Sequence, residues 1–148
     1  MRGPEVVARN QKMKVNMDRE GLPYNGDRNM SYNSRLAQEV SKWAEGKGKA
    51  DEIHDALFRA YFVDVKNIGK PEVLSKIAEE NGLPADEATD VLLSRKFKDA
   101  VDDDWRRCAA IGVNAVPTFL AGKYLMVGAQ PYEELERLVK HAAQADPA

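Results

Sequence analysis

The sequence predicts a mostly helical α/β protein, in which about four or five helices are followed by a β-hairpin and a closing helix. Apolar residues recur at a helical spacing as far as Gly112. Between residues 117 and 127 the period changes from about 3.6 to about 2, which is typical of strands. A last amphipathic segment then returns to the helical spacing.

The composition suits one hydrophobic core without disulfide or metal support, since 43% of the 148 residues are hydrophobic. Charged residues make up 31% of the chain, yet the net charge is only -2, so no broad field attracts nucleic acid or an anionic membrane. No segment approaches the roughly 18 apolar residues of a membrane span, and the first residues have no signal-peptide pattern. We therefore expect a cytoplasmic protein with no nucleic-acid or membrane partner.

The first helix is expected over residues 4–20, before a break that reads GLPYNGD at residues 21–27. Ser31 or Asn33 can cap the next helix, which ends at Gly46 and Gly48. Its apolar stripe consists of Leu36, Val40, Trp43 and Ala44.

The following helix has the clearest periodicity and is expected to be the most buried of the group. Phe58 and Phe62 widen its stripe towards a second contact. The main stripe consists of Ile53, Ala56, Leu57, Ala60 and Tyr61.

Two prolines mark the starts of the next two helices. Pro71 suits a first helical position, and Asn81-Gly82 closes that helix. Pro84 opens a longer helix, which we expect to run without interruption to Gly112. Its apolar positions are Leu93, Phe97, Ala100, Val101, Trp105 and Cys108.

Two short strands are expected at residues 117–121 and 124–127, on either side of the turn Gly122-Lys123. Pro131 then precedes a helix with acidic residues in its first turn. Its inward residues are Leu135, Leu138 and Val139.

Two stretches near the end of the chain carry a family resemblance. GVNAVPTF at residues 112–119 resembles the cis-proline loop of DsbA-like thioredoxin-fold proteins, and VGAQP at residues 127–131 is similar to a motif of their FrnE-like members. Upstream, ALFRAYF at residues 56–62 and EVL at residues 72–74 resemble the helical insertion of that family. The resemblance implies a helical insertion domain over residues 1–111 and the C-terminal ββα part of a thioredoxin-like domain over residues 112–148.

The family's reactive part has no counterpart here, because its first strand, its Cys-x-x-Cys and its second strand are missing from the sequence. The resemblance implies a thiol-disulfide oxidoreductase homologue that is redox-inactive alone, without a catalytic residue or a cofactor. It also implies that Val116, Pro117 and Thr118 bind an extended peptide or thiol substrate by backbone pairing. A plainer interpretation is that Pro117 only begins an edge strand.

Two other functions stay open. A glutathione-dependent relative of 2-hydroxychromene-2-carboxylate isomerase and kappa-class transferase would share the helical insertion and the proline loop. A non-catalytic peptide-binding or chaperone-like module would hold peptides without chemistry. In every case the strand at residues 117–121 has an unpaired edge, so we expect a homodimer or a complementing thioredoxin-half segment.

Other reactive side chains are better explained as structural. Cys108 excludes an intramolecular disulfide, fits a reducing compartment and is expected to be buried. His54 and His141 are expected to be exposed, and residues 102–104 point in different directions on a helix, so no metal site is predicted. The helical aromatic residues are expected in the core: Trp43, Phe58, Tyr61, Phe62, Phe97 and Trp105.

Overall fold

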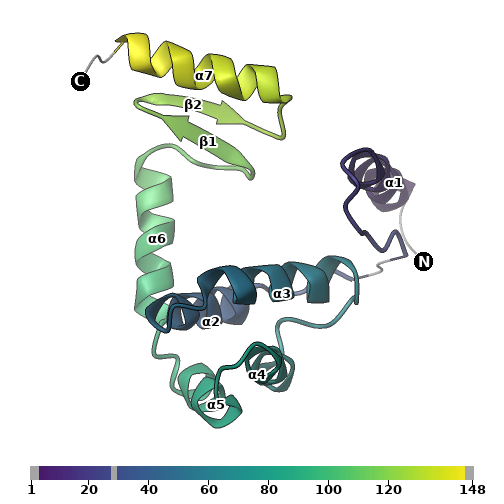
Figure 1. Cartoon of the computed structure of the whole chain (residues 1–148), viewed down its shortest axis with the longest axis vertical. Coiled ribbons are helices and arrows are strands. Elements are labelled where there is room, and N and C mark those ends of the chain that lie inside the picture. Colours follow the sequence, from purple (N-terminus) through teal and green to yellow (C-terminus); the bar gives the residue numbers. More distant parts are fainter. Residues whose placement is uncertain (1–3, 28–29, 146–148) are drawn as a thin grey trace. The chain divides into compact units, whose positions relative to one another are not determined.

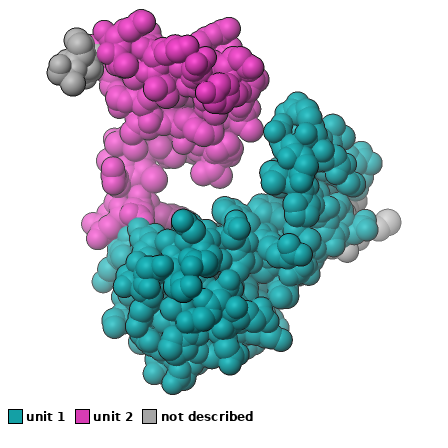
Figure 2. Space-filling view, viewed as in Figure 1, with its two compact units in different colours: residues 1–102 teal, residues 103–148 magenta. Residues whose placement is uncertain are grey.

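A computed structural model of the chain describes residues 4–27 and 30–145. It divides into two compact units, of which unit 1 ends at Asp102 and unit 2 begins at Asp103 (Figure 2). Within the described residues the predicted order is confirmed: helices come first, then a hairpin and a last helix (Figure 1). The elements are α1 (Pro4–Arg19), α2 (Arg35–Gly46), α3 (Ala50–Phe62), α4 (Pro71–Glu80), α5 (Ala85–Ser94), α6 (Lys98–Ala110), β1 (Thr118–Ala121), β2 (Tyr124–Val127) and α7 (Tyr132–Ala145).

The core of unit 1 lies among α2, α3, α4 and α5. Burying one large aliphatic side chain stabilises a fold by about 1.5 to 3 kcal/mol, so this cluster accounts for much of the stability of the unit. Helix α2, and not α3, is the most buried helix, because it packs against α3, α4 and α5 while α3 keeps one face exposed. The largest fully buried apolar side chains of the core are Ile53, Leu74, Leu92 and Val40.

Local signals place the starts and ends of these helices. The N-cap of α2 is Ser34, and neither Ser31 nor Asn33, so that prediction is wrong. Asn33 still accepts a hydrogen bond from the backbone N–H of Arg35 at 2.8 Å, just before the helix. Pro71 is the first residue of α4, as predicted. Asn81 ends that helix, and Gly82 follows with a φ of +81°, a conformation that suits glycine.

The long helix predicted from Pro84 to Gly112 is wrong, because the chain breaks between α5 and α6. Arg95 adopts the left-handed conformation with a φ of 55°. Its guanidinium binds the carboxylate of Glu39, with Nη2 at 2.6 Å from Oε1 and Nε at 3.0 Å from Oε2. This contact with a residue 56 positions earlier in the chain stabilises the break.

In unit 2, β1 and β2 form a two-stranded antiparallel sheet, and α7 packs against both strands (Figure 1). Thr118 is paired with Val127, and Leu120 with Leu125. The predicted turn is confirmed, with Gly122 at a φ of 56°. No described residue of unit 2 is buried, and Val139, predicted to face inward, is 61% exposed.

The aromatic residues divide between core and surface. Trp43 is buried as predicted, and Tyr61 and Phe97 pack against the core. Phe58 and Trp105 are instead 62% and 57% exposed, which contradicts the prediction. Cys108 is also exposed, since α6 has no buried residue after Val101. The predicted exposure of His54 and His141 is confirmed.

Candidate functional site

The loop before β1 contains the three predicted substrate-binding residues. The Val116–Pro117 peptide bond is cis, and the Val116 side chain is 90% exposed. The Thr118 hydroxyl donates a hydrogen bond to the carbonyl of Ala115 at 2.6 Å, which closes the loop upon itself. On the other side, the carbonyl of Pro117 accepts a hydrogen bond from the N–H of Gly128 at 2.8 Å. The loop is therefore held at both ends while Val116 stays accessible.

The register of the hairpin decides which backbone groups of β1 face outward. Hydrogen-bonded and non-bonded pairs alternate along an antiparallel ladder, and Pro117 opposite Gly128 is a bonded position. Phe119 and Ala121 therefore bond to β2, whereas the N–H and C=O groups of Thr118 and Leu120 point to the other edge. No described strand covers that edge. An extended chain could pair there, directly after Val116 and Pro117.

A charged cluster in unit 1 was not predicted from the sequence. The Glu39 carboxylate is fully buried and accepts hydrogen bonds from Arg95 and Arg35. These bonds, with that from Arg95 the stronger influence, lower the pKa of Glu39 although burial opposes this. Arg35 also pairs with Asp102, whose pKa is lowered first by a hydrogen bond from Lys98 and then by Arg35. Because its central charge is paired and enclosed, we assign the cluster to stability. The i,i+4 spacings of Arg35 with Glu39 and of Lys98 with Asp102 could have indicated it.

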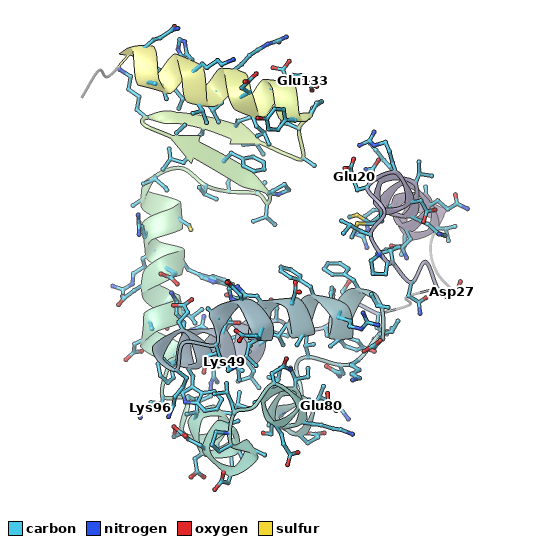
Figure 3. All side chains as sticks on the ribbon, in the orientation of Figure 1. Glu20, Asp27, Lys49, Glu80, Lys96 and Glu133 are labelled. Carbon is cyan, nitrogen blue, oxygen red and sulfur yellow. The ribbon has the colours of Figure 1, made fainter. Side chains whose placement is uncertain are left out.

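A cavity of about 920 Å³ in unit 1 was also missed. One side of it is formed by α3, and α4 contributes Glu80, which is labelled in Figure 3. Phe58 and Phe62, which lie outside the main apolar stripe of α3, form part of the lining of this cavity. The sequence signal for it was the second apolar direction of that helix, which the core does not use.

Other kinds of site find no support in the described residues. No three histidine, cysteine or acidic side chains among them come together as a metal site would require. None of the helices described here is both long enough and apolar enough to cross a membrane.

A helical domain leading into a cis-proline loop, a hairpin and a covering helix is the arrangement of a thioredoxin-like protein with a helical insertion. The family model of the DSBA-like thioredoxin domain matches residues 3–140. The chain therefore belongs to the DSBA-like thioredoxin domain family, a family of the thiol-disulfide oxidoreductase kind.

Individual relatives agree with this assignment. The uncharacterized protein YwbO of Bacillus subtilis is 30% identical over 105 residues, which are 70% of this chain and 52% of YwbO. The crystal structure of a probable DsbA oxidoreductase from Streptomyces coelicolor is 25% identical, with a TM-score of 0.86 over 100% of this chain and 64% of that one. This chain thus spans about half the length of YwbO and less than two thirds of the Streptomyces protein.

A third relative supports the fold alone. It is a Nitrosomonas europaea protein named as a protein disulfide isomerase, 21% identical, with a TM-score of 0.73 over 97% of this chain and 76% of that one.

Proposed function

We propose that this chain is the substrate-binding part of a FrnE-like thiol-disulfide oxidoreductase and that it is redox-inactive alone. The observation that carries the proposal is the exposed loop of Val116, Pro117 and Thr118, which continues into the uncovered edge of β1. An extended polypeptide that pairs with this edge would lie across the loop. The main chain would provide affinity for many sequences, as a protein with diverse substrates requires.

The redox part of the proposal follows from the number of thiols. A dithiol reduces a substrate disulfide in two steps: a thiolate first forms a mixed disulfide, and a second thiol of the same protein then displaces the substrate. Cys108 is the only cysteine in the sequence, so the second displacement has no group to perform it within one chain. We therefore expect no acceleration of insulin reduction by dithiothreitol.

The same edge bears on the partners of the chain. A two-stranded hairpin is marginal by itself, and the unbonded groups of Thr118 and Leu120 favour a further strand. We propose that a second copy or a complementing thioredoxin-half segment pairs there in the absence of substrate. Size-exclusion chromatography with light scattering at micromolar concentrations tests the homodimer, and a monomer at every concentration would exclude it.

Backbone pairing can be tested with a chemically matched pair of peptides. A short peptide of alternating leucine and serine should shift the NMR amide signals of Thr118 and Leu120. The same peptide with alternate amides N-methylated should bind at least about tenfold more weakly, because it cannot donate to a strand edge. Equal binding of the two peptides would overturn the backbone mechanism and favour a chaperone-like module that holds side chains.

A protein-side test uses two leucines that lie opposite one another in the hairpin. Leu120 and Leu125 are both partly exposed, and neither N–H takes part in the ladder between β1 and β2. Leu120→Pro removes a donor from the β1 edge, whereas Leu125→Pro removes one from the far edge of β2. Only Leu120→Pro should weaken peptide binding, and circular dichroism checks that both variants stay folded.

A further inference from the structure

The cavity beside α3 has an aromatic side that reaches the surface. Phe58 and Phe62 stack with their ring centroids 6.2 Å apart and their planes at 23°. Tyr24 packs on Phe62 from the segment after α1, with centroids 6.3 Å apart. Phe58 is 62% exposed, so its ring offers apolar area and a face to anything that enters the cavity.

The ionisable side chains of the lining are mostly acidic. Against the cations Arg59 and Lys66 stand four carboxylates: Glu52, Asp55, Asp64 and Glu80. Three of these carboxylates already have a lysine nearby. Lys49 lies 2.9 Å from Glu52, Lys66 lies 3.6 Å from Asp64, and Lys76 lies 3.9 Å from Glu80.

Asp55 differs from the other three, because no ion pair of Asp55 is found among the residues that the structure describes, although Arg59 lies one helical turn further along α3. It precedes Phe58 by three positions on α3, so the carboxylate and the ring occupy neighbouring places on one helix face. A second depression of about 410 Å³ shares Glu52, Asp55 and Phe58 with this cavity and is also lined by Asp51 and His54. Asp51 and Asp55, for which no ion pair is described, therefore place negative charge beside an exposed ring on α3.

We propose that this surface binds a segment of substrate polypeptide in which lysine or arginine stands next to a large apolar side chain. The apolar side chain would enter the cavity against Phe62 and Ile77, and the cation would lie near Asp55 and the face of Phe58. Both the carboxylate and the aromatic face attract a cation. This inference rests on the proposed function, because it names the class of polypeptide which the oxidoreductase would select.

Two adjoining depressions on α3 suit an extended polypeptide. Small-ligand sites are typically about 300 to 1,000 Å³ and enclose most of the ligand. The cavity volume falls within that range, but the second depression, which shares three lining residues with the cavity, offers room for a further side chain. An extended segment can occupy both, with one side chain in each.

The test compares two fluorescein-labelled peptides, one of alternating leucine and lysine and one of alternating leucine and glutamate. Anisotropy titrations of the whole chain should show at least about tenfold tighter binding of the lysine peptide, with the difference reduced at high salt. Amide shifts in α3 should accompany its binding. Equal affinities, or shifts that avoid α3, would overturn the proposal.

Matched variants locate the charge preference. Asp55→Lys should weaken binding of the lysine peptide by about five- to tenfold, as reversal of one exposed charge allows. Asp90→Lys makes the same change on α5, at an exposed residue outside the cavity lining, and should leave the affinity within about twofold. Phe58→Ala should also weaken binding, whereas Leu93→Ala, at a 70% exposed position of α5, should not.

Two further readouts separate the alternatives. If benzyltrimethylammonium displaces the lysine peptide and binds with the same affinity as that peptide, the site is one for small cations and the proposal fails. If the lysine and glutamate peptides bind equally, but N-methylation of the leucine–serine peptide still weakens its binding to the β1 edge at Leu120, only this inference fails. If α3 responds and the β1 edge does not, the proposed function is the part that is wrong.

Discussion

The two units of this chain differ in how much of their apolar surface is covered. Unit 1 encloses a cluster of fully buried side chains and even a buried carboxylate, Glu39. In unit 2 no described residue is buried, although α7 and the hairpin pack against one another (Figure 1). Amphipathicity therefore states which face of an element is apolar, but it does not state whether anything covers that face.

The two units should differ most in the free energy of unfolding that each loses when one of its leucines is truncated to alanine. Leu74→Ala, at a fully buried position of α4, should lower the free energy of unfolding of unit 1 by about 3 kcal/mol, since it leaves a cavity. Leu125→Ala, at a 39% exposed position of β2, should cost less than about 1 kcal/mol.

Urea unfolding followed by Trp43 emission, in a Trp105→Phe background, reports on unit 1 for the first variant. Circular dichroism follows the second. Equal losses from the two substitutions would mean that unit 2 is as well packed as unit 1.

The next effect concerns the buried carboxylate. Glu39→Gln should lower the free energy of unfolding by about 2 kcal/mol, because the hydrogen bonds from Arg95 and Arg35 lose their charged acceptor. Glu45→Gln on the same helix removes an exposed partner of Lys42 and should cost less than about 0.5 kcal/mol. Urea denaturation of both variants checks this, and a Glu39→Gln cost as small as that of Glu45→Gln would contradict the structural role.

A smaller effect is the pH dependence of the difference in free energy of unfolding between wild type and Glu39→Gln. The pKa of Glu39 is lowered in the fold, so the folded state binds fewer protons than the unfolded state as pH falls past about 4.3, the ordinary value for glutamate. The free energy of unfolding thus keeps the Glu39 contribution above this pH and loses it as pH falls through the folded pKa.

Asp102 and Glu87 also have lowered pKa values, so they too make the free energy of unfolding fall as pH falls. The pH dependence of wild type alone therefore does not isolate the contribution of Glu39. The difference between wild type and Glu39→Gln should narrow steadily as pH is lowered. Denaturation at a series of pH values measures it, and a constant difference would show that the charge of Glu39 is not responsible.

The smallest expected effect is on the reactivity of Cys108. Because this thiol is exposed in unit 2, its rate of reaction with Ellman's reagent in the native chain should be within about threefold of the rate in urea. Protection by a factor of ten or more would indicate that unit 2 becomes covered in solution, for example in a dimer. Cys108→Ser serves as the blank.

Much of unit 1 could be predicted because its signals are local. Pro71, Asn81 and Gly82 mark helix ends through their own backbone preferences, and the turn at Gly122 follows from the same kind of preference. The failures occur where a distant residue decides. The break at Arg95 depends on Glu39, and the exposure of Phe58 depends on how the helices around α3 are packed.

By itself the sequence determined the order of helices, hairpin and helix, the cis-proline-like loop at Val116 and Pro117, and the kinship with DsbA-like proteins, because each depends on residues close together in the chain. Only the tertiary structure decided that α2 is the central helix, that Glu39 is enclosed by two arginines, and that Cys108 faces outward. Burial is a property of neighbours in space, and periodicity in one segment contains no information about which other segment covers it.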